Sequence, residues 1–270
     1  ADTAEEAVRW ANERGERVGA VKVRLYRPFD VERFLRALPA TTKTLAVMDR
    51  TKEPGSSGEP LLQDVLTAFH EDAQASTPRF AQSPRAVGVR YGLSSKELTP
   101  AMLIGLFAEM ARERPRRRLT LGIHDDLSDT TVTYDRDLDI EPASVKRAVF
   151  WGLGSDGTVG AAKNTIKIIG EDAGLEAQGS FVYDSKKSGA RTVSHLRFGP
   201  DPIRSAYLIA NAGFVGIHQF GFFERYDVLA NVGHGATVLL NAPYDASEVW
   251  DHIPKDAQRI LRERNVALWT

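Results

Sequence analysis

Apolar residues in the first half of the chain form short runs separated by segments with an apolar residue every three or four positions. Short apolar runs are typical of strands, and the longer spacing is typical of helices. The runs predict strands at residues 18–25, 44–48, 86–91 and 119–123. The spaced segments predict helices at residues 4–14, 31–38, 61–70 and 101–112. Regular alternation of this kind predicts right-handed crossovers and a parallel sheet with helices on both faces.

The second half begins with an apolar run at 148–151, which predicts a buried strand. Glycines at positions 152, 154 and 157 follow it, and the apolar residues from Val159 to Ile169 then recur at helical spacing. We call residues 152–157 the glycine turn. Further strands are predicted at 180–183, 192–198, 214–218, 237–241 and 266–269, and helices at 201–209, 223–229 and 256–264. This half is therefore also expected to be an α/β domain.

A strand, a glycine turn and a helix N-terminus in that order predict an anion site. Backbone N–H groups converge at such a helix start, and the helix dipole favours negative charge. The candidate ligand-binding residues here are Gly154, Ser155, Asp156, Gly157 and Thr158. Ser155 and Thr158 are also candidate helix N-caps. The spacing matches the G-x-G-x-x-G fingerprint of dinucleotide-binding folds.

A second polar cluster follows the strand predicted at 180–183. Asp184 could accept hydrogen bonds from a ribose, and Lys186 and Lys187 could bind a phosphate. Such a set suits an adenosine with an additional ribose phosphate, a description that fits both NADP and coenzyme A. The alternative is that the two lysines are merely solvated.

Residues 125–142 are polar and contain six aspartates. We interpret this stretch as the connection between two domains, at residues 1–140 and 145–270. The expected fold class is α/β, with two consecutive open, mostly parallel sheets flanked by helices.

The composition of the chain excludes several classes of function. The net charge of −1 provides no general field for nucleic acid or anionic membranes, and no apolar run is long enough to span a bilayer. We therefore expect a soluble cytoplasmic protein. The basic run Arg116–Arg118 is interpreted as a solvated loop rather than a phosphate site. The 270 residues contain no cysteine, which excludes thiolate ligands and a cysteine nucleophile within this chain.

Neither a metal site nor a catalytic residue is predicted. The adjacent residues His124, Asp125 and Asp126 would point in alternating directions, so a metal cage is not expected. His195 and His218 lie in apolar strand patterns and are expected to be interior histidines with satisfied hydrogen bonds.

Several longer motifs occur in an order that spans nearly the whole chain. They are VKVRLYRPF (21–29), DRTKEPG (49–55), GLGSDGTVG (152–160), IKIIG (166–170), VYDSKKSG (182–189) and HLRFG (195–199). By these motifs the chain resembles the middle portion of the pyruvate:ferredoxin (or flavodoxin) oxidoreductases, a family of multidomain 2-oxoacid oxidoreductases.

The resemblance implies a role for each half. Residues 1–140 would be a transketolase C-terminal-like domain, mainly structural. Residues 145–270 would be a gamma-type, Rossmann-like domain that binds coenzyme A. The parent enzyme would convert pyruvate and coenzyme A to acetyl-CoA and CO2 with thiamine diphosphate, Mg²⁺ and iron–sulfur clusters. Its partners would be its remaining domains, a second copy in a homodimer, and ferredoxin or flavodoxin.

Other features predict that the chain is a fragment, inactive alone. It starts in a predicted helix, stops on a predicted strand, and lacks a Gly-Asp-Gly motif for the thiamine diphosphate site. The gamma-type domain is expected to be truncated at its C-terminus. Departures from the family pattern include Ala162 in place of Asn, Ala190 in place of Gly, and Phe220 where the family usually has Pro.

Two alternatives remain open. The chain could be a Rossmann-type oxidoreductase that binds NADP at the glycine turn. It could also be a scaffold module without a ligand, in which the glycines only permit tight packing of helix on strand.

Overall fold

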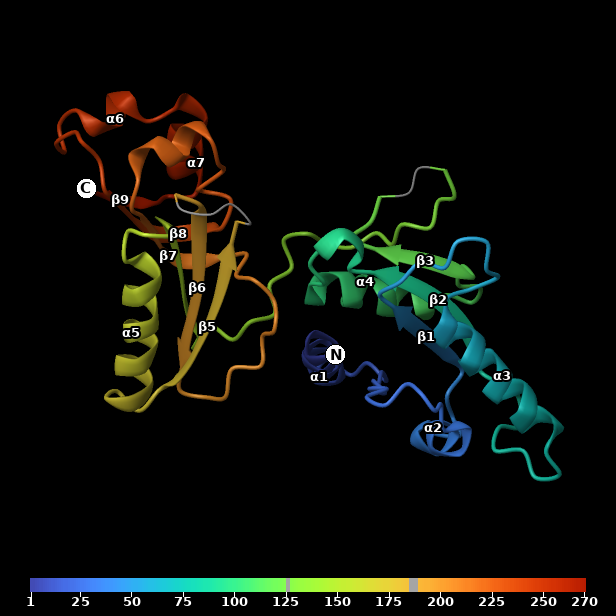
Figure 1. The fold of residues 1–270 in the computed structure, drawn as a ribbon. Helices are drawn as coiled ribbons and strands as arrows, with labels where there is room; N and C mark the ends of the chain where they lie inside the picture. The colour runs from blue at the N-terminus through green and yellow to red at the C-terminus, as the bar shows by residue number, and fades with distance from the viewer. Residues whose placement is uncertain (125–126, 185–188) are drawn as a thin grey trace. The chain divides into compact units, whose positions relative to one another are not determined.

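The computed structural model describes residues 1–124, 127–184 and 189–270. The chain divides into two compact units, which we describe separately (Figure 1). The first unit contains Ala1–Ile140 with Ser205–Tyr207, and the second contains Glu141–Arg204 with Leu208–Thr270. Lys186 and Lys187 lie outside the described residues. No helix in the described part of the chain is both long enough and apolar enough to span a bilayer.

The first unit is a three-stranded parallel sheet with helices on both faces. In chain order its elements are α1 (Asp2–Asn12), α2 (Val31–Ala37), β1 (Thr44–Asp49), α3 (Pro60–Gln74), β2 (Arg85–Tyr91), a short 3-10 helix (Leu93–Ser95), α4 (Pro100–Met110) and β3 (Arg118–Leu121). The strand order is β1-β2-β3, and both pairings are parallel.

Alternate residues of the strands pack into two separate cores. Val87 and Val89 of β2 contact residues of α1 and α4 on one face. Val47 of β1 packs with apolar residues of α2 and α3 on the other face. The expectation that helices cover both faces of the first sheet is confirmed.

The strand predicted at residues 18–25 is wrong. The segment has no strand partner among the described residues. The side-chain amide of Asn12 bonds both the N–H and the C=O of Val18, and the Lys22 ammonium lies 2.9 Å from Asp2 and 2.6 Å from Glu5. These contacts hold the segment against α1 instead of β1. Its apolar side chains are consequently exposed, Leu25 by 73%.

The second unit is built on a six-stranded sheet. Its elements are β4 (Lys146–Leu153), α5 (Thr158–Glu171), β5 (Glu176–Tyr183), β6 (Arg191–Gly199), β7 (Ala212–Ile217), a 3-10 helix (Phe220–Glu224), β8 (Val232–Leu240), α6 (Val249–His252), α7 (Lys255–Glu263) and β9 (Ala267–Trp269). The strand order is β5-β6-β4-β7-β8-β9. Strands β4, β7, β8 and β9 are parallel, whereas β6 is antiparallel to both of its neighbours. The predicted fold class, two α/β units with mostly parallel sheets, is confirmed.

The two faces of this sheet carry different cores. Helix α5 packs on one face, where Ala162 meets Ala148 and Leu196. The larger core lies on the other face and includes Val249 of α6 and Leu261 of α7. In Figure 1, α5 stands apart from the α6 and α7 region.

Two helices predicted in this half do not form. Residues 201–209 are irregular, because Pro202 disfavours helix and Ser205 and Tyr207 bond to the carboxylate of Glu6 at 2.8 and 3.3 Å. Residues 223–229 form only the end of a 3-10 helix followed by turns. There Tyr226 stacks on Trp151 of β4 at 6.2 Å and Phe222 belongs to the core, so tertiary packing decides the conformation.

Candidate functional site

The candidate site is the carboxyl edge of the second sheet. The parallel strands β4 and β7 end side by side, with Trp151 level with Ile217. After β4 the chain enters α5 on one face, and after β7 it enters the 3-10 helix whose Phe222 belongs to the core of the other face. This divergence is a topological switch point, where open α/β sheets usually bind their ligands.

Two glycines of the turn are required by the backbone itself. Gly157 has a φ of +85°, a conformation that side chains rarely adopt. A Cβ on Gly152 would lie 2.2 Å from the hydroxyl oxygen of Thr158. These two positions therefore need glycine with or without a ligand.

Asp156 closes the turn. Its carboxylate accepts hydrogen bonds from the backbone N–H of Leu153 at 2.7 Å and of Thr158 at 2.9 Å. Burial raises the pKa of Asp156, but the hydroxyl of Thr158 and these two N–H groups outweigh that effect, so the pKa is below its ordinary value. The N-cap of α5 is Gly157, without a side-chain cap, so the interpretation of Ser155 or Thr158 as N-cap is wrong.

A polar contact crosses the switch point. The buried hydroxyl of Thr158 lies 2.7 Å from Nδ1 of His218, the residue that follows β7. Asn241, which follows β8, donates from its side-chain amide to the carbonyl of His218 at 3.1 Å. The ends of β4, β7 and β8 are thereby linked by side chains. Sequence reasoning did not identify Asn241, and no motif marks it.

Two backbone N–H groups at the start of α5 have no acceptor within the helix. The first N–H bonded to the preceding turn is that of Ala161, which donates to Gly157 at 2.9 Å. The N–H groups of Val159 and Gly160 come before it and have no acceptor within the helix. A Cβ on Gly157 or Gly160 would meet nothing within 4 Å, so the backbone is open to a ligand here.

Cationic side chains lie at the same edge of the sheet. Arg191 opens β6, level with Leu153 of β4, and its guanidinium lies 4.7 Å from the ring centre of Tyr226. Sequence reasoning did not single out Arg191, because an arginine at a strand start has no distinguishing pattern. Lys163, on the second turn of α5, lies over the ring of Phe181 at 5.7 Å.

The topology does not favour the NADP alternative. In a Rossmann unit the crossover helix leads to the adjacent parallel strand, whose end carries the ribose-binding acid. Here β6 lies between β4 and β5. Asp184, which follows β5, is therefore two strand spacings, roughly 10 Å, from the end of β4.

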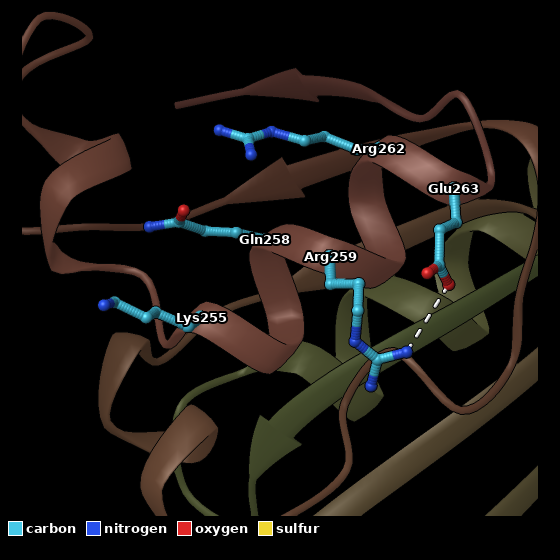
Figure 2. A pocket seen from close by; sticks show the side chains of 5 residues that line it. All are labelled: Lys255, Gln258, Arg259, Arg262 and Glu263. Atoms are coloured by element: carbon cyan, nitrogen blue, oxygen red, sulfur yellow. Dashed lines mark ion pairs between the residues drawn. The ribbon is translucent and has the colours of Figure 1, made fainter.

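A hollow of about 450 Å³ elsewhere in this unit does not form a convergent site. Figure 2 shows its lining side chains, all from α7: Lys255, Gln258 and Arg262 extend to the left of the view, and Arg259 and Glu263 approach each other. Arg259 pairs with Glu263 at 3.5 Å, Arg262 lies over the ring of Trp250, and Gln258 donates to a backbone carbonyl. In the described part of the chain, no group of three or more acidic, histidine or cysteine side chains could hold a metal ion.

Comparisons with known proteins agree with the resemblance found in the sequence. The family model "Pyruvate ferredoxin/flavodoxin oxidoreductase" matches residues 147–270, and the model "Pyruvate:ferredoxin oxidoreductase core domain II" matches residues 1–84. The pyruvate-flavodoxin oxidoreductase of Nostoc sp. is 53% identical over 99% of this chain. The pyruvate:ferredoxin oxidoreductase of Moorella thermoacetica is 46% identical over 98% of it.

The match covers only part of these relatives: the chain spans 23% and 22% of their lengths. Among solved structures, the pyruvate oxidoreductase subunit PORC of Thermotoga maritima is 15% identical, with a TM-score of 0.33 over 41% of this chain and 57% of that one. A likeness at this level supports no argument. The two family models together match most of the chain, and the relatives match nearly all of it at about half identity. By these matches the chain belongs to the pyruvate ferredoxin/flavodoxin oxidoreductase family.

Proposed function

We propose that this chain is the portion of a pyruvate:ferredoxin or flavodoxin oxidoreductase that binds coenzyme A. The complete enzyme would convert pyruvate and coenzyme A to acetyl-CoA and CO2 and pass two electrons to ferredoxin or flavodoxin. The names of the relatives support this activity. The second unit would act as the gamma-type domain, and the first unit would act as a structural, transketolase C-terminal-like domain.

The observation that carries the proposal is the open start of α5 at the switch point. The N–H groups of Val159 and Gly160 point to where the helix dipole favours an anion, and no side chain covers Gly157 or Gly160. The diphosphate of coenzyme A would bind there. Gly154 and Ser155 belong to the glycine turn, Thr158 follows it as the first residue of α5, and Asp156 would act by holding the shape of the turn.

Charge complementarity supports the same ligand. Arg191 lies at this edge of the sheet, and Lys186 and Lys187 follow β5, which ends at the same edge. We propose that the two lysines bind the ribose phosphate of coenzyme A, which distinguishes it from dephospho-coenzyme A.

The other cofactors of the proposed enzyme would be held elsewhere. Iron–sulfur clusters need cysteine ligands, and these 270 residues contain none. Thiamine diphosphate and Mg²⁺ would likewise bind to other domains of the complete, homodimeric cytoplasmic enzyme. The chain alone would bind substrate without turning it over.

Glycine substitutions within α5 test the proposal. Gly160→Ala places a methyl group where the ligand would approach, whereas Gly170→Ala changes the same helix near its other end. Alanine is favoured over glycine inside helices by about 1 kcal/mol, so neither variant should lose stability. We expect Gly160→Ala to weaken binding of coenzyme A about tenfold in calorimetry, roughly the loss of one hydrogen bond to a charged group.

Three results would count against the proposal. Gly170→Ala should bind as the parent chain does, and equal binding by Gly160→Ala would place the ligand elsewhere. Binding of NADP in preference to coenzyme A would favour the Rossmann-type alternative. Failure of the parent chain to bind any adenine nucleotide would support the scaffold alternative.

A further inference from the structure

A hollow of about 410 Å³ in the first unit is lined mainly by arginines. Among the residues that the structure describes, its lining includes Arg90, Arg116, Arg117 and Arg118 and one acidic residue, Asp129. Two strands contribute to it, since Arg90 lies on β2 and Arg118 begins β3. Arg118 is level with Gly88, two residues before Arg90, so both side chains leave the same face of the sheet.

Two of the arginines are held in place by buried carboxylates. Arg90 bonds the side chain of Glu59, which is 5% exposed. Arg116 bonds the side chain of Glu109, 3% exposed, at 3.1 Å, and donates to the carbonyl of Asp129 at 2.7 Å. These buried partners fix the two guanidinium groups without closing the hollow.

The other two arginines, Arg117 and Arg118, are not paired with a carboxylate among the described residues. Among the described residues Arg117 has no ionic partner, and Arg118 donates only to the neutral carbonyl of Ser57. The carboxylate of Asp129 is 99% exposed and lies 3.9 Å from Arg116, so solvent screens it. The hollow therefore presents two guanidinium groups with unused donors beside two that are fixed.

We propose that this arginine hollow binds a phosphate group of a small molecule. Guanidinium groups present N–H donors in a planar fork that matches phosphate oxygens two at a time. The volume is within the range of small-molecule sites. The sequence had favoured a solvated loop for Arg116–Arg118, but the fold brings this run together with Arg90. The proposal is independent of the coenzyme A site, because the described residues that line the hollow all belong to the first unit.

Pyrophosphate and inorganic phosphate are suitable probes for the intact 270-residue chain in calorimetry at low and moderate salt. Arg117→Gln combined with Arg118→Gln should weaken pyrophosphate binding at least about tenfold, as expected for charge-assisted hydrogen bonds. Arg114→Gln combined with Arg136→Gln removes the same charge from exposed positions outside the hollow. This control should bind within about twofold of the parent chain, because exposed charges act weakly at a distance.

The single variant Arg117→Gln guards against misfolding, since the Arg117 side chain is exposed and has no ionic partner among the described residues. It should weaken binding by about threefold with unchanged thermal stability. Tighter binding of pyrophosphate than of phosphate would indicate a diphosphate ester as the natural ligand, and equal binding would indicate a single phosphate group. The proposal would be overturned if the Arg117→Gln and Arg118→Gln double variant bound pyrophosphate as well as the control does. It would also be overturned if Gly160→Ala abolished the binding, or if the parent chain did not bind pyrophosphate or phosphate at all.

Discussion

The hydroxyl of Thr158 and Nδ1 of His218 lie 2.7 Å apart and join the first residue of α5 to the residue that follows β7. The contact bridges the two loops that leave the sheet on opposite faces. It therefore fixes the start of α5 relative to the end of β7.

Removing the Thr158 hydroxyl should destabilise the second unit. Thr158→Val retains the shape but leaves Nδ1 of His218 without its partner, which costs about 1–3 kcal/mol. Urea unfolding measures the change. Thr165→Val is the matched control, because the hydroxyl of Thr165 is exposed on the same helix and bonds only a carbonyl one turn back. Equal losses from both variants would show that the bridge contributes nothing of its own.

Protonation of Asp156 should loosen the glycine turn in acid. Its pKa is below the ordinary 3.8, so its contribution to stability is complete above that pH and is lost as the pH falls through the folded-state pKa. The protection of the Leu153 and Thr158 amides, measured as exchange relative to the unfolded chain at the same pH, should therefore decrease below about pH 3.8. In Asp156→Asn this acid-dependent loss of amide protection should be absent. Its persistence in that variant would assign it to another group.

His195 should make the second unit less stable at mildly acidic pH. Burial, and then the charge of Arg197, lowers the pKa of His195 to about 4, while its Nδ1 accepts a hydrogen bond from the N–H of Ile209 at 3.2 Å. In the unfolded chain His195 is protonated as the pH falls through about 6.5, whereas in the folded chain it is protonated only near pH 4. The free energy of unfolding should therefore decrease by about 3 kcal/mol across this interval.

His195→Asn tests this assignment, because its side-chain oxygen can occupy the acceptor position of Nδ1. The variant should show a flatter pH dependence between pH 6.5 and 4 in urea titrations. His70→Asn changes an exposed histidine and should leave the slope as it is in the parent chain. A slope that His195→Asn does not alter would contradict the assignment.

The buried pair between Glu141 and Arg197 should be costly to break. Arg197 donates from Nε and from a terminal nitrogen to the two oxygens of Glu141 at 2.8 and 2.9 Å, and the side chains are 0% and 2% exposed. Glu141→Gln leaves a buried charge without its counter-charge and should cost about 3–5 kcal/mol. Glu171→Gln, which breaks an exposed pair with Lys167, should cost less than about 0.5 kcal/mol. Thermal unfolding of both variants compares the two losses.

Local patterns predicted most helices and strands because each depends on residues close in sequence. The prediction of a strand at 18–25 was wrong because its conformation depends on residues farther away in the sequence. Its alternation of apolar residues suits a strand, but Lys22 is held by Asp2 and Glu5 of α1, and hydropathy does not show such contacts. The helix predicted at residues 223–229 was wrong for a similar reason, since Tyr226 stacks on Trp151, a residue distant in the sequence.

The sequence alone determined the strand, turn and helix around residues 152–160, because Gly157 needs a positive φ and the apolar spacing of α5 is local. It could not determine the neighbours of β4. Only the tertiary structure placed antiparallel β6 between β4 and β5, and brought His218 to Thr158 across sixty positions of chain. Strand order and such contacts arise from hydrogen bonds and packing between distant segments, which a local pattern does not encode.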